Sequence, residues 1–180
     1  MTMQKQDAEQ PLVSVIIPTY NRGWCLTEAL DSVLSQTYER YELIVVDDGS
    51  TDDTRNLLEH QFPRVKVILQ PNSGVSAARN AAIRLANTEW IALLDSDDEW
   101  KPDKLEKQVE AIAADVECQA CHTDEMWVRN GVRVNPMKKH AKPDGYIFDS
   151  CLPLCCVSPS SILLHKSVFD KYGLFDESMP

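Results

Sequence analysis

Hydrophobic residues follow two alternating patterns along the chain: short β-branched runs and longer stretches with helical spacing. Apolar runs begin near residues 13, 43, 65 and 90, and a helical pattern follows each of them. The first helical pattern places Leu26, Ala29, Leu30 and Val33 on one face. Runs that are apolar throughout are typical of strands covered on both faces, and hence of a parallel sheet. The pattern therefore predicts an α/β fold, a βαβαβαβ series whose mainly parallel sheet is flanked by helices.

The rhythm changes after residue 115. Two short β-runs, residues 126–128 and 132–134, flank Asn130-Gly131, and Asn-Gly between such runs is a strong hairpin signal. We therefore expect a small mixed β region in the last third, laid on the sheet. The expected organisation is one domain with a flexible N-terminus over 1–10, an α/β half over 11–115 and the mixed region over 116–180.

Composition narrows the class of protein. Among 180 residues there are 18 Lys+Arg and 28 Asp+Glu, a net charge of −10. We expect no nucleic-acid partner, because phosphate backbones are bound through clustered basic residues. No apolar run approaches the roughly 18 residues of a membrane span, and residues 1–10 lack the apolar core of a signal peptide. These features predict a cytoplasmic protein whose six cysteines are buried, reduced thiols rather than zinc ligands.

Polar clusters follow the predicted strands, where open α/β sheets bind their ligands. The richest is Asp95-Ser96-Asp97-Asp98. Three crowded carboxylates repel one another unless a cation is present, and hard oxygen ligands favour Mg²⁺ or Mn²⁺, which usually contact phosphates as well. The alternative is helix N-capping, which explains one Asp but not three.

Three further side chains have both a functional and an ordinary interpretation. Asp48 can accept hydrogen bonds from a base or a ribose, in which case its loss should weaken binding but barely affect stability, or it can be a solvated turn residue. Tyr20 offers a flat face on which a base can stack, although a Tyr after a strand most often serves packing. Arg79 can reach a diphosphate from the start of a helix, or it can form an ion pair on the helix surface.

Two other enzyme and signalling classes fit less well. A nucleotidyltransferase also carries acidic metal ligands on a parallel sheet, but the chain has no Lys-rich Gly loop near its start. A response-regulator receiver needs a phosphoacceptor Asp after the third strand, where this chain has Gln70-Pro71-Asn72.

Five motifs, in this order, resemble the family 2 glycosyltransferases of the GT-A fold. They are residues 13–22, 32–37, 45–52, 72–80 and 94–98, with weaker matches at 161–164 and 173–177. The resemblance implies that 11–115 form the nucleotide-sugar-binding half and that 116–180 begin the acceptor-side region. It also implies a UDP-sugar as the first-choice donor, a glycan or lipid-linked acceptor, and contact with the inner face of a membrane.

The resemblance assigns roles to individual residues. The nucleotide-binding residues are Pro18, Thr19, Tyr20, Asp48, Arg79, Asp95 and Ser96. Asp97 and Asp95 would hold Mn²⁺ or Mg²⁺, with Asp98 and His165 as weaker candidates, and the metal would stabilise the leaving diphosphate. The general base of inverting members follows the stretch that corresponds to 173–177, so we expect it beyond Pro180. The alternative is a nucleotide-sugar-binding module without turnover, because this base is missing.

Overall fold

The computed structural model describes residues 12–134, 142–143, 145–153 and 155–179. Its first part alternates strands with helices: β1 (Val13–Thr19), α1 (Leu26–Leu34), β2 (Tyr41–Asp47), α2 (Thr54–Gln61), β3 (Lys66–Leu69), α3 (Val75–Leu85), β4 (Trp90–Leu93) and α4 (Lys104–Ala114). The later elements are shorter: β5 (Ala120–His122), β6 (Trp127–Arg129), β7 (Val132–Val134), α5 (Phe148–Cys151), the 3₁₀ turn η2 (Pro159–Ser161), β8 (Ile162–His165) and α6 (Ser167–Tyr172). The flexible terminus expected over 1–10 lies outside the described residues.

Six strands form one sheet in the order β3-β2-β1-β4-β8-β5. The first four strands are parallel, which confirms the α/β fold class. β8 pairs antiparallel with β4, and β5 pairs antiparallel with β8. The last third of the chain therefore extends the main sheet along the free edge of β4, whereas we expected it to lie on the sheet. The predicted hairpin at Asn130-Gly131 is confirmed as β6-β7, a separate two-stranded sheet.

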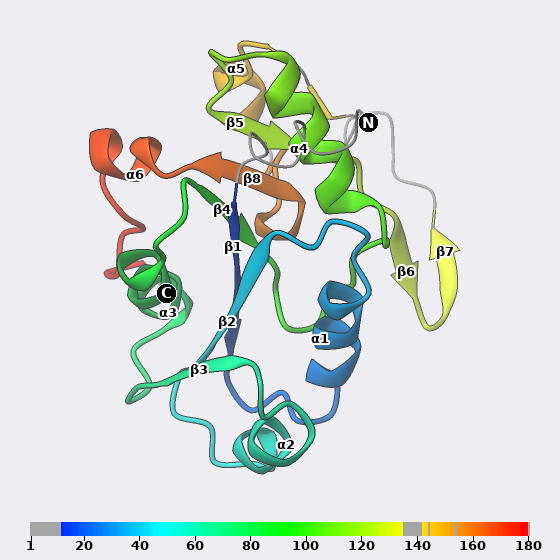
Figure 1. Cartoon of the computed structure of the whole chain (residues 1–180), viewed down its shortest axis with the longest axis vertical. Coiled ribbons are helices and arrows are strands. Elements are labelled where there is room, and N and C mark those ends of the chain that lie inside the picture. Colours follow the sequence, from blue (N-terminus) through cyan, green and yellow to red (C-terminus); the bar gives the residue numbers. More distant parts are fainter. Residues whose placement is uncertain (1–11, 135–141, 144, 154, 180) are drawn as a thin grey trace, which may run out of the picture.

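Helices cover both faces of the sheet (Figure 1). Val15 and Ile17 of β1 belong to the hydrophobic core that the sheet shares with α1, α2 and α4. Ile16, between them, belongs to the opposite core, which contains Ala78 and Ile83 of α3 and Phe169 of α6. Alternate residues of a strand point to opposite faces, so a central strand with a layer on each side is apolar at most positions, and the buried Ser14 of β1 is satisfied by hydrogen bonds to Glu42 and Thr88. Edge strand β3 is only partly buried.

The six cysteines are not buried as expected. Cys151 and Cys155 are exposed, and the other four are partly exposed. Five of the six lie after residue 115, where elements are short and little of the chain is enclosed by the two cores. Among the described residues, no helix has both the length and the hydrophobicity that crossing a bilayer requires.

Candidate functional site

The carboxyl ends of β1, β2 and β4 meet at one edge of the sheet. Thr19 and Asp47 are register partners at the ends of β1 and β2, and the Asp48 N–H donates to the Thr19 carbonyl oxygen at 2.9 Å. The acidic loop, residues 95–98, follows β4, which pairs with β1 through Ile16. Strand pairing thus brings together three motifs that are far apart in the sequence.

Asn21 holds the loop after β1 against the loop after β2. Its backbone lies in the left-handed region, with φ 53°, which Asn tolerates better than most residues. Its Oδ1 accepts hydrogen bonds from the N–H groups of Thr51 (2.8 Å) and Asp52 (3.2 Å). Tyr20 and Arg22, on either side of Asn21, are therefore displayed from a fixed turn.

The carboxylate of Asp48 is 4% exposed and already hydrogen-bonded by the protein. Oδ1 accepts from Gln70 Nε2 (2.7 Å) and the Ser73 N–H (2.9 Å), and Oδ2 accepts from the Gly74 N–H (2.8 Å). Because an ionised carboxylate has about four acceptor positions, about one remains for a ligand. Asp48 anchors the loop between β3 and α3, so its interpretation as a solvated turn residue is wrong. Its contact with a base stays a prediction.

Arg79 points from α3 toward the same edge of the sheet. Its Nη2 lies 2.7 Å from Asp95 Oδ1, and its side chain is only 11% exposed. The Phe175 ring lies 5.6 Å from the guanidinium carbon, and Arg79 Nε is buried without a hydrogen-bond partner. The interpretation of Arg79 as a surface ion pair is therefore wrong. It is a largely buried cation whose Nε donor has no partner, a group that suits an anionic ligand.

The acidic loop concentrates negative charge. Asp97 is half exposed and lies 3.7 Å from the Arg22 guanidinium. Asp98 Oδ2 accepts a hydrogen bond of 2.6 Å from the Ser160 hydroxyl. Partial burial raises the pKa of Asp98, although its side chain reaches solvent, and the neighbouring carboxylates add to the rise. The crowding of like charge expected from the sequence is present in the fold, and a cation would relieve it.

The acidic loop suits a metal ion that is shared with a phosphate ligand, but not one that is held by protein side chains alone. Among the residues that the structure describes, no three His, Cys, Asp or Glu side chains converge to hold a metal. Mg²⁺, however, is usually bound by one or two carboxylates while phosphates and water supply the rest. Asp97 fits that donor set because it is half exposed, whereas Asp95 is already paired with Arg79. These residues fit a divalent cation that arrives with a phosphate ligand.

The other predicted nucleotide-binding residues divide into two pairs. Tyr20 is 45% exposed, so its ring can contact a ligand, whereas Thr19 is buried with its Oγ1 unpartnered. Pro18 lies within β1 beside Val46. Ser96 is buried, and its carbonyl oxygen accepts a hydrogen bond from Cys25 Sγ. Pro18 and Ser96 therefore shape the strand end and the acidic loop.

His165 does not reach this edge of the sheet. Because β8 runs antiparallel to β4, His165 lies opposite Trp90, the first residue of β4. The two rings form a T-shaped contact at 5.1 Å, and His165 Nδ1 lies 2.7 Å from Ser167 Oγ. The acidic loop follows the other end of β4. The expectation that His165 joins the metal site is therefore wrong. The carboxyl end of β8 lies at the opposite edge of the sheet from the carboxyl ends of the parallel strands.

Sequence reasoning missed two residues of the site. Ser160 bonds both ends of the acidic loop from 62 and 65 residues away, and Phe175 covers Arg79. No local pattern marks either role, since Ser160 stands in a polar run and Phe175 resembles any core aromatic. Both contacts depend on the chain returning beside β4 and α3.

Comparisons with known proteins fit this geometry. Residues 14–173 match the family model described as Glycosyl transferase family 2. TuaG of Bacillus subtilis (strain 168), whose name connects it with teichuronic acid biosynthesis, is 47% identical over 106 residues, 56% of this chain and 42% of TuaG. The Escherichia coli UDP-Glc:alpha-D-GlcNAc-diphosphoundecaprenol beta-1,3-glucosyltransferase WfgD is 31% identical over 164 residues, 90% of this chain and 63% of WfgD.

A solved structure shares the fold. S. aureus TarS 1-349 has a TM-score of 0.77 and 28% identity to this chain, covering 93% of this chain and 51% of TarS 1-349; TarS complexes with UDP and with UDP-GlcNAc also match. This confirms the expected GT-A type of fold. The chain spans about half the length of the curated relatives it matches. The match of the family model across most of the chain shows that the protein belongs to glycosyl transferase family 2.

Proposed function

We propose that this chain forms the donor-binding part of an enzyme that transfers a sugar from a UDP-sugar to an acceptor hydroxyl, with inversion and with Mn²⁺ or Mg²⁺. One observation carries the donor site. Three groups lie on neighbouring elements at one edge of the sheet: the Arg79 guanidinium with its unpartnered Nε, the half-exposed Asp97 carboxylate and the exposed Tyr20 ring. A cation, an anion and an aromatic face together suit a nucleotide diphosphate.

Each of these residues has a distinct task in the proposed site. Tyr20 stacks on the base, and the remaining acceptor position of Asp48 fixes the edge of the base or the ribose. Arg79 contacts the diphosphate from α3, with its guanidinium held by Asp95. Asp97 holds the divalent cation, which when bound neutralises the charge of the departing diphosphate.

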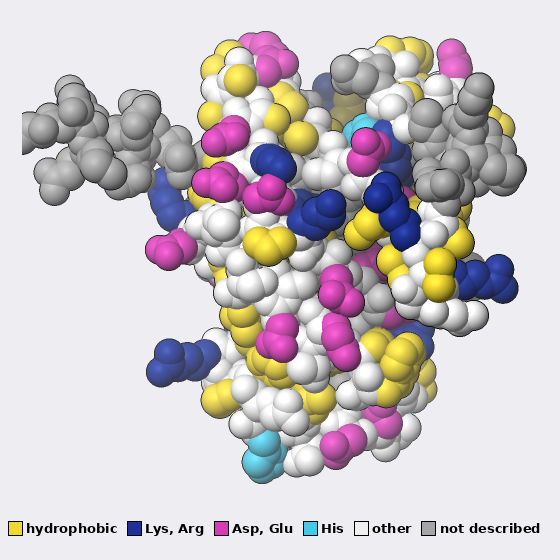
Figure 2. All heavy atoms as spheres, turned by 90° about the vertical axis from the view of Figure 1, so that its right-hand side faces the viewer, with side chains coloured by type: hydrophobic (Ala, Val, Ile, Leu, Met, Phe, Trp, Pro, Cys, Tyr) yellow, Lys and Arg dark blue, Asp and Glu magenta, His cyan; other side chains and the backbone are white. Residues whose placement is uncertain are grey.

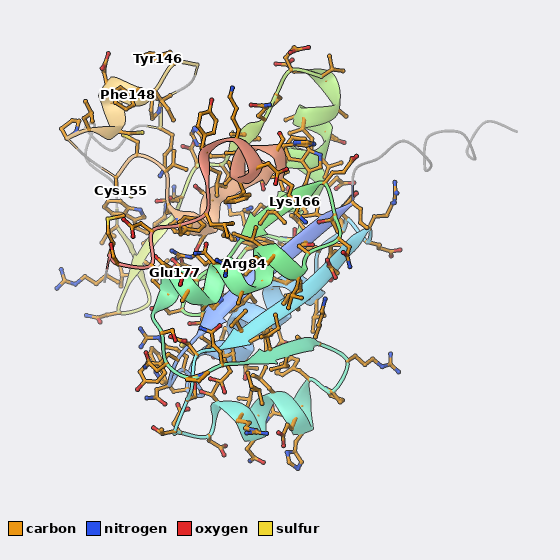
Figure 3. The ribbon with its side chains drawn as sticks, turned by 90° about the vertical axis from the view of Figure 1, so that its left-hand side faces the viewer. Arg84, Tyr146, Phe148, Cys155, Lys166 and Glu177 are labelled. Carbon is orange, nitrogen blue, oxygen red and sulfur yellow. The ribbon has the colours of Figure 1, made fainter. Side chains whose placement is uncertain are left out.

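The general base is proposed to be a carboxylate that follows the 173–177 segment. Asp176 and Glu177 themselves are poor candidates, because hydrogen bonds lower the pKa of both: Ser178 bonds Asp176, and Asn80 and Arg84 bond Glu177. Figure 3 shows Glu177 beside Arg84 of α3, and the ion pair between them measures 3.3 Å. A carboxylate with a lowered pKa is a weaker proton acceptor.

The acceptor is proposed to be a lipid-linked glycan, used at the inner face of a membrane. The support comes from relatives: the name of WfgD includes a diphosphoundecaprenol-linked sugar, and that of TuaG includes teichuronic acid biosynthesis. The alternative, a donor-binding module without turnover, is not favoured, because these relatives are named as glycosyltransferases.

Calorimetry with UDP tests the donor site and its metal together. We expect UDP to bind in the presence of Mn²⁺ and its affinity to fall at least about tenfold with excess chelator, because the cation neutralises repulsion between Asp97 and the diphosphate. Asp97→Asn should reproduce that loss. Asp53→Asn is the matched control, since Asp53 is exposed and its carboxylate accepts a hydrogen bond from the nearby Asn56 side chain, away from the acidic loop.

The outcomes separate the parts of the proposal. Equal UDP affinity with and without chelator would contradict the proposed metal dependence but not the proposed donor site. Absence of UDP binding, or a preference for GDP or ADP, would overturn the proposed donor.

A further inference from the structure

The hydroxyl of Ser160 touches the acidic loop at both of its ends. Ser160 is 9% exposed and lies in η2, the turn before β8. Its Oγ accepts a hydrogen bond from the Asp95 N–H at 3.0 Å and donates to Asp98 Oδ2 at 2.6 Å. A hydroxyl carries one donor and two acceptor positions, so this bridge uses both capacities of one atom. Asp97 lies between the two fixed points.

The turn that carries Ser160 is itself held firmly by the core. Trp100 Nε1 donates to the Ser160 carbonyl oxygen at 2.7 Å, and Gln108 Nε2 donates to the Ser161 carbonyl oxygen at 3.1 Å. Trp100 is 7% exposed and packs under Lys104, whose Nζ lies 3.9 Å from the ring centroid. Buried, hydrogen-bonded groups of this kind cannot shift without losing their partners. The turn η2 therefore offers the acidic loop a partner that is fixed to the core.

We infer that Ser160 is a positioning residue for the donor site, whose hydroxyl fixes the direction in which Asp97 faces the diphosphate. The inference rests on the proposed function in so far as the donor and its cation bind at Asp97. Without the hydroxyl, the Asp95 N–H and the Asp98 carboxylate both lose a partner. Repulsion between the carboxylates of the loop is then free to turn them apart.

Two variants of Ser160 and one of its neighbour test the inference. Ser160→Ala removes the bridge, and Ser160→Thr restores a hydroxyl. Ser161→Ala is the matched control, because Ser161 is 2% exposed in the same turn but its hydroxyl donates to the Ser158 carbonyl oxygen, away from the loop. Two quantities are measured on each protein: the exchange rate of the Asp95 amide hydrogen, and the Kd of UDP in the presence of Mn²⁺.

We expect Ser160→Ala to speed exchange of the Asp95 amide and to raise the Kd of UDP about tenfold, the effect of losing a hydrogen bond to a charged group. Exchange of the neighbouring Leu94 amide, which donates to the Ile16 carbonyl oxygen in the sheet, reports general opening and should change far less. Ser160→Thr should recover both quantities. Ser161→Ala should leave both near the wild-type values.

Several outcomes overturn the inference. A wild-type Kd in Ser160→Ala, or an equal loss of affinity in Ser160→Ala and Ser161→Ala, shows that the bridge does not position the loop for the donor. If the wild-type chain binds no UDP, the proposed function fails, and the Asp95 amide alone then decides whether Ser160 fixes the loop. The amide measurement needs no ligand, so the two failures are distinguishable.

Discussion

The side-chain amide of Asn80 closes both backbone hydrogen bonds of Phe175, as a neighbouring strand would. Nδ2 donates to the Phe175 carbonyl oxygen at 2.8 Å, and Oδ1 accepts from the Phe175 N–H at 3.0 Å. Asn80 is 1% exposed and is adjacent to Arg79, whose guanidinium lies over the Phe175 ring. Two consecutive residues of α3, Arg79 and Asn80, thus both contact Phe175, which ties the 173–177 segment to the Arg79 side of the site.

Replacing Asn80 should therefore destabilise the protein. Asn80→Ala leaves two backbone groups of Phe175 without their partners, and each such group costs about 1–3 kcal/mol when it is shielded from water. We expect a loss of about 2 kcal/mol or more in the free energy of unfolding, measured by urea denaturation. Asn56→Ala, which removes an exposed hydrogen bond between Asn56 of α2 and Asp53 just before that helix, should lower the free energy of unfolding much less. Equal losses in the two variants would contradict the prediction.

Replacing Asp48 should cost both stability and UDP affinity. The expectation from the sequence, that its loss barely affects stability, does not agree with its three hydrogen bonds to the loop between β3 and α3. We expect Asp48→Ala to lower the free energy of unfolding by about 1.5–3 kcal/mol. Asp48→Asn should also destabilise, since an amide nitrogen cannot accept the hydrogen bonds of Ser73 or Gly74. Urea denaturation and calorimetry with UDP measure the two effects, and full stability in both variants would disprove the anchoring role.

Gly49 and Gly131 form a matched pair for testing steric crowding near the site. Both have positive φ, 80° and 72°, and a side chain at either position costs about 1–2 kcal/mol in backbone strain. A Cβ on Gly49 would also lie 2.8 Å from the Asn72 backbone nitrogen, whereas one on Gly131 would meet nothing within 4 Å. Gly49→Ala should therefore destabilise by at least about 1 kcal/mol more than Gly131→Ala. Thermal unfolding of both variants checks the difference, which vanishes if the loop of Asn72 can move away freely.

Lys104 should make stability depend on pH. Burial lowers its pKa to about 7 from an ordinary value of 10.5. Between these values the unfolded chain binds a proton that the folded chain does not, so stability rises as the pH rises from about 7 toward 10.5. Below pH 7 the folded protein carries the full cost of a buried charge, roughly 5 kcal/mol for a pKa lowered this far.

Lys104→Met removes this dependence. We expect the variant to exceed the wild type in stability most clearly near pH 6–7, with a gain that shrinks toward pH 10, measured by urea denaturation across this range. Lys107 on the same helix is the control. Its hydrogen bond with Asp103 raises its pKa, so Lys107→Met should give no such gain. If the difference in free energy of unfolding between Lys104→Met and the wild type did not change with pH, the lowered pKa of Lys104 would be contradicted.

Charged and hydrophobic side chains share the surface of the molecule. Figure 2 shows acidic, basic and hydrophobic side chains interspersed on the face that lies at the right of Figure 1. Tyr146 and Phe148, labelled at the edge of the molecule in Figure 3, are 84% and 57% exposed. They lie in the part of the chain whose elements are short and partly outside the two cores.

Local sequence patterns were enough to predict the parallel half of the fold and the position of its polar clusters. A short β-branched apolar run such as 43–46 is typical of a strand covered on both faces, and a helical segment after each strand provides the crossover that makes neighbouring strands parallel. The carboxyl ends of β1, β2 and β4 then have to meet, which is why Thr19, Asp48 and the 95–98 loop were identified correctly as neighbours. Asn130-Gly131 specified its hairpin through the backbone conformation that the turn needs.

The way in which the last third of the chain joins the sheet depends on long-range contacts that no local pattern predicts. A four-residue run such as 162–165 carries no information about its direction, because direction depends on which edge of the sheet is free and on contacts more than 60 residues away. The antiparallel entry of β8 moved His165 away from the acidic loop and brought Ser160 onto it. The same long-range folding placed Phe175 on Arg79 and so buried a cation that sequence alone could have left on a helix surface.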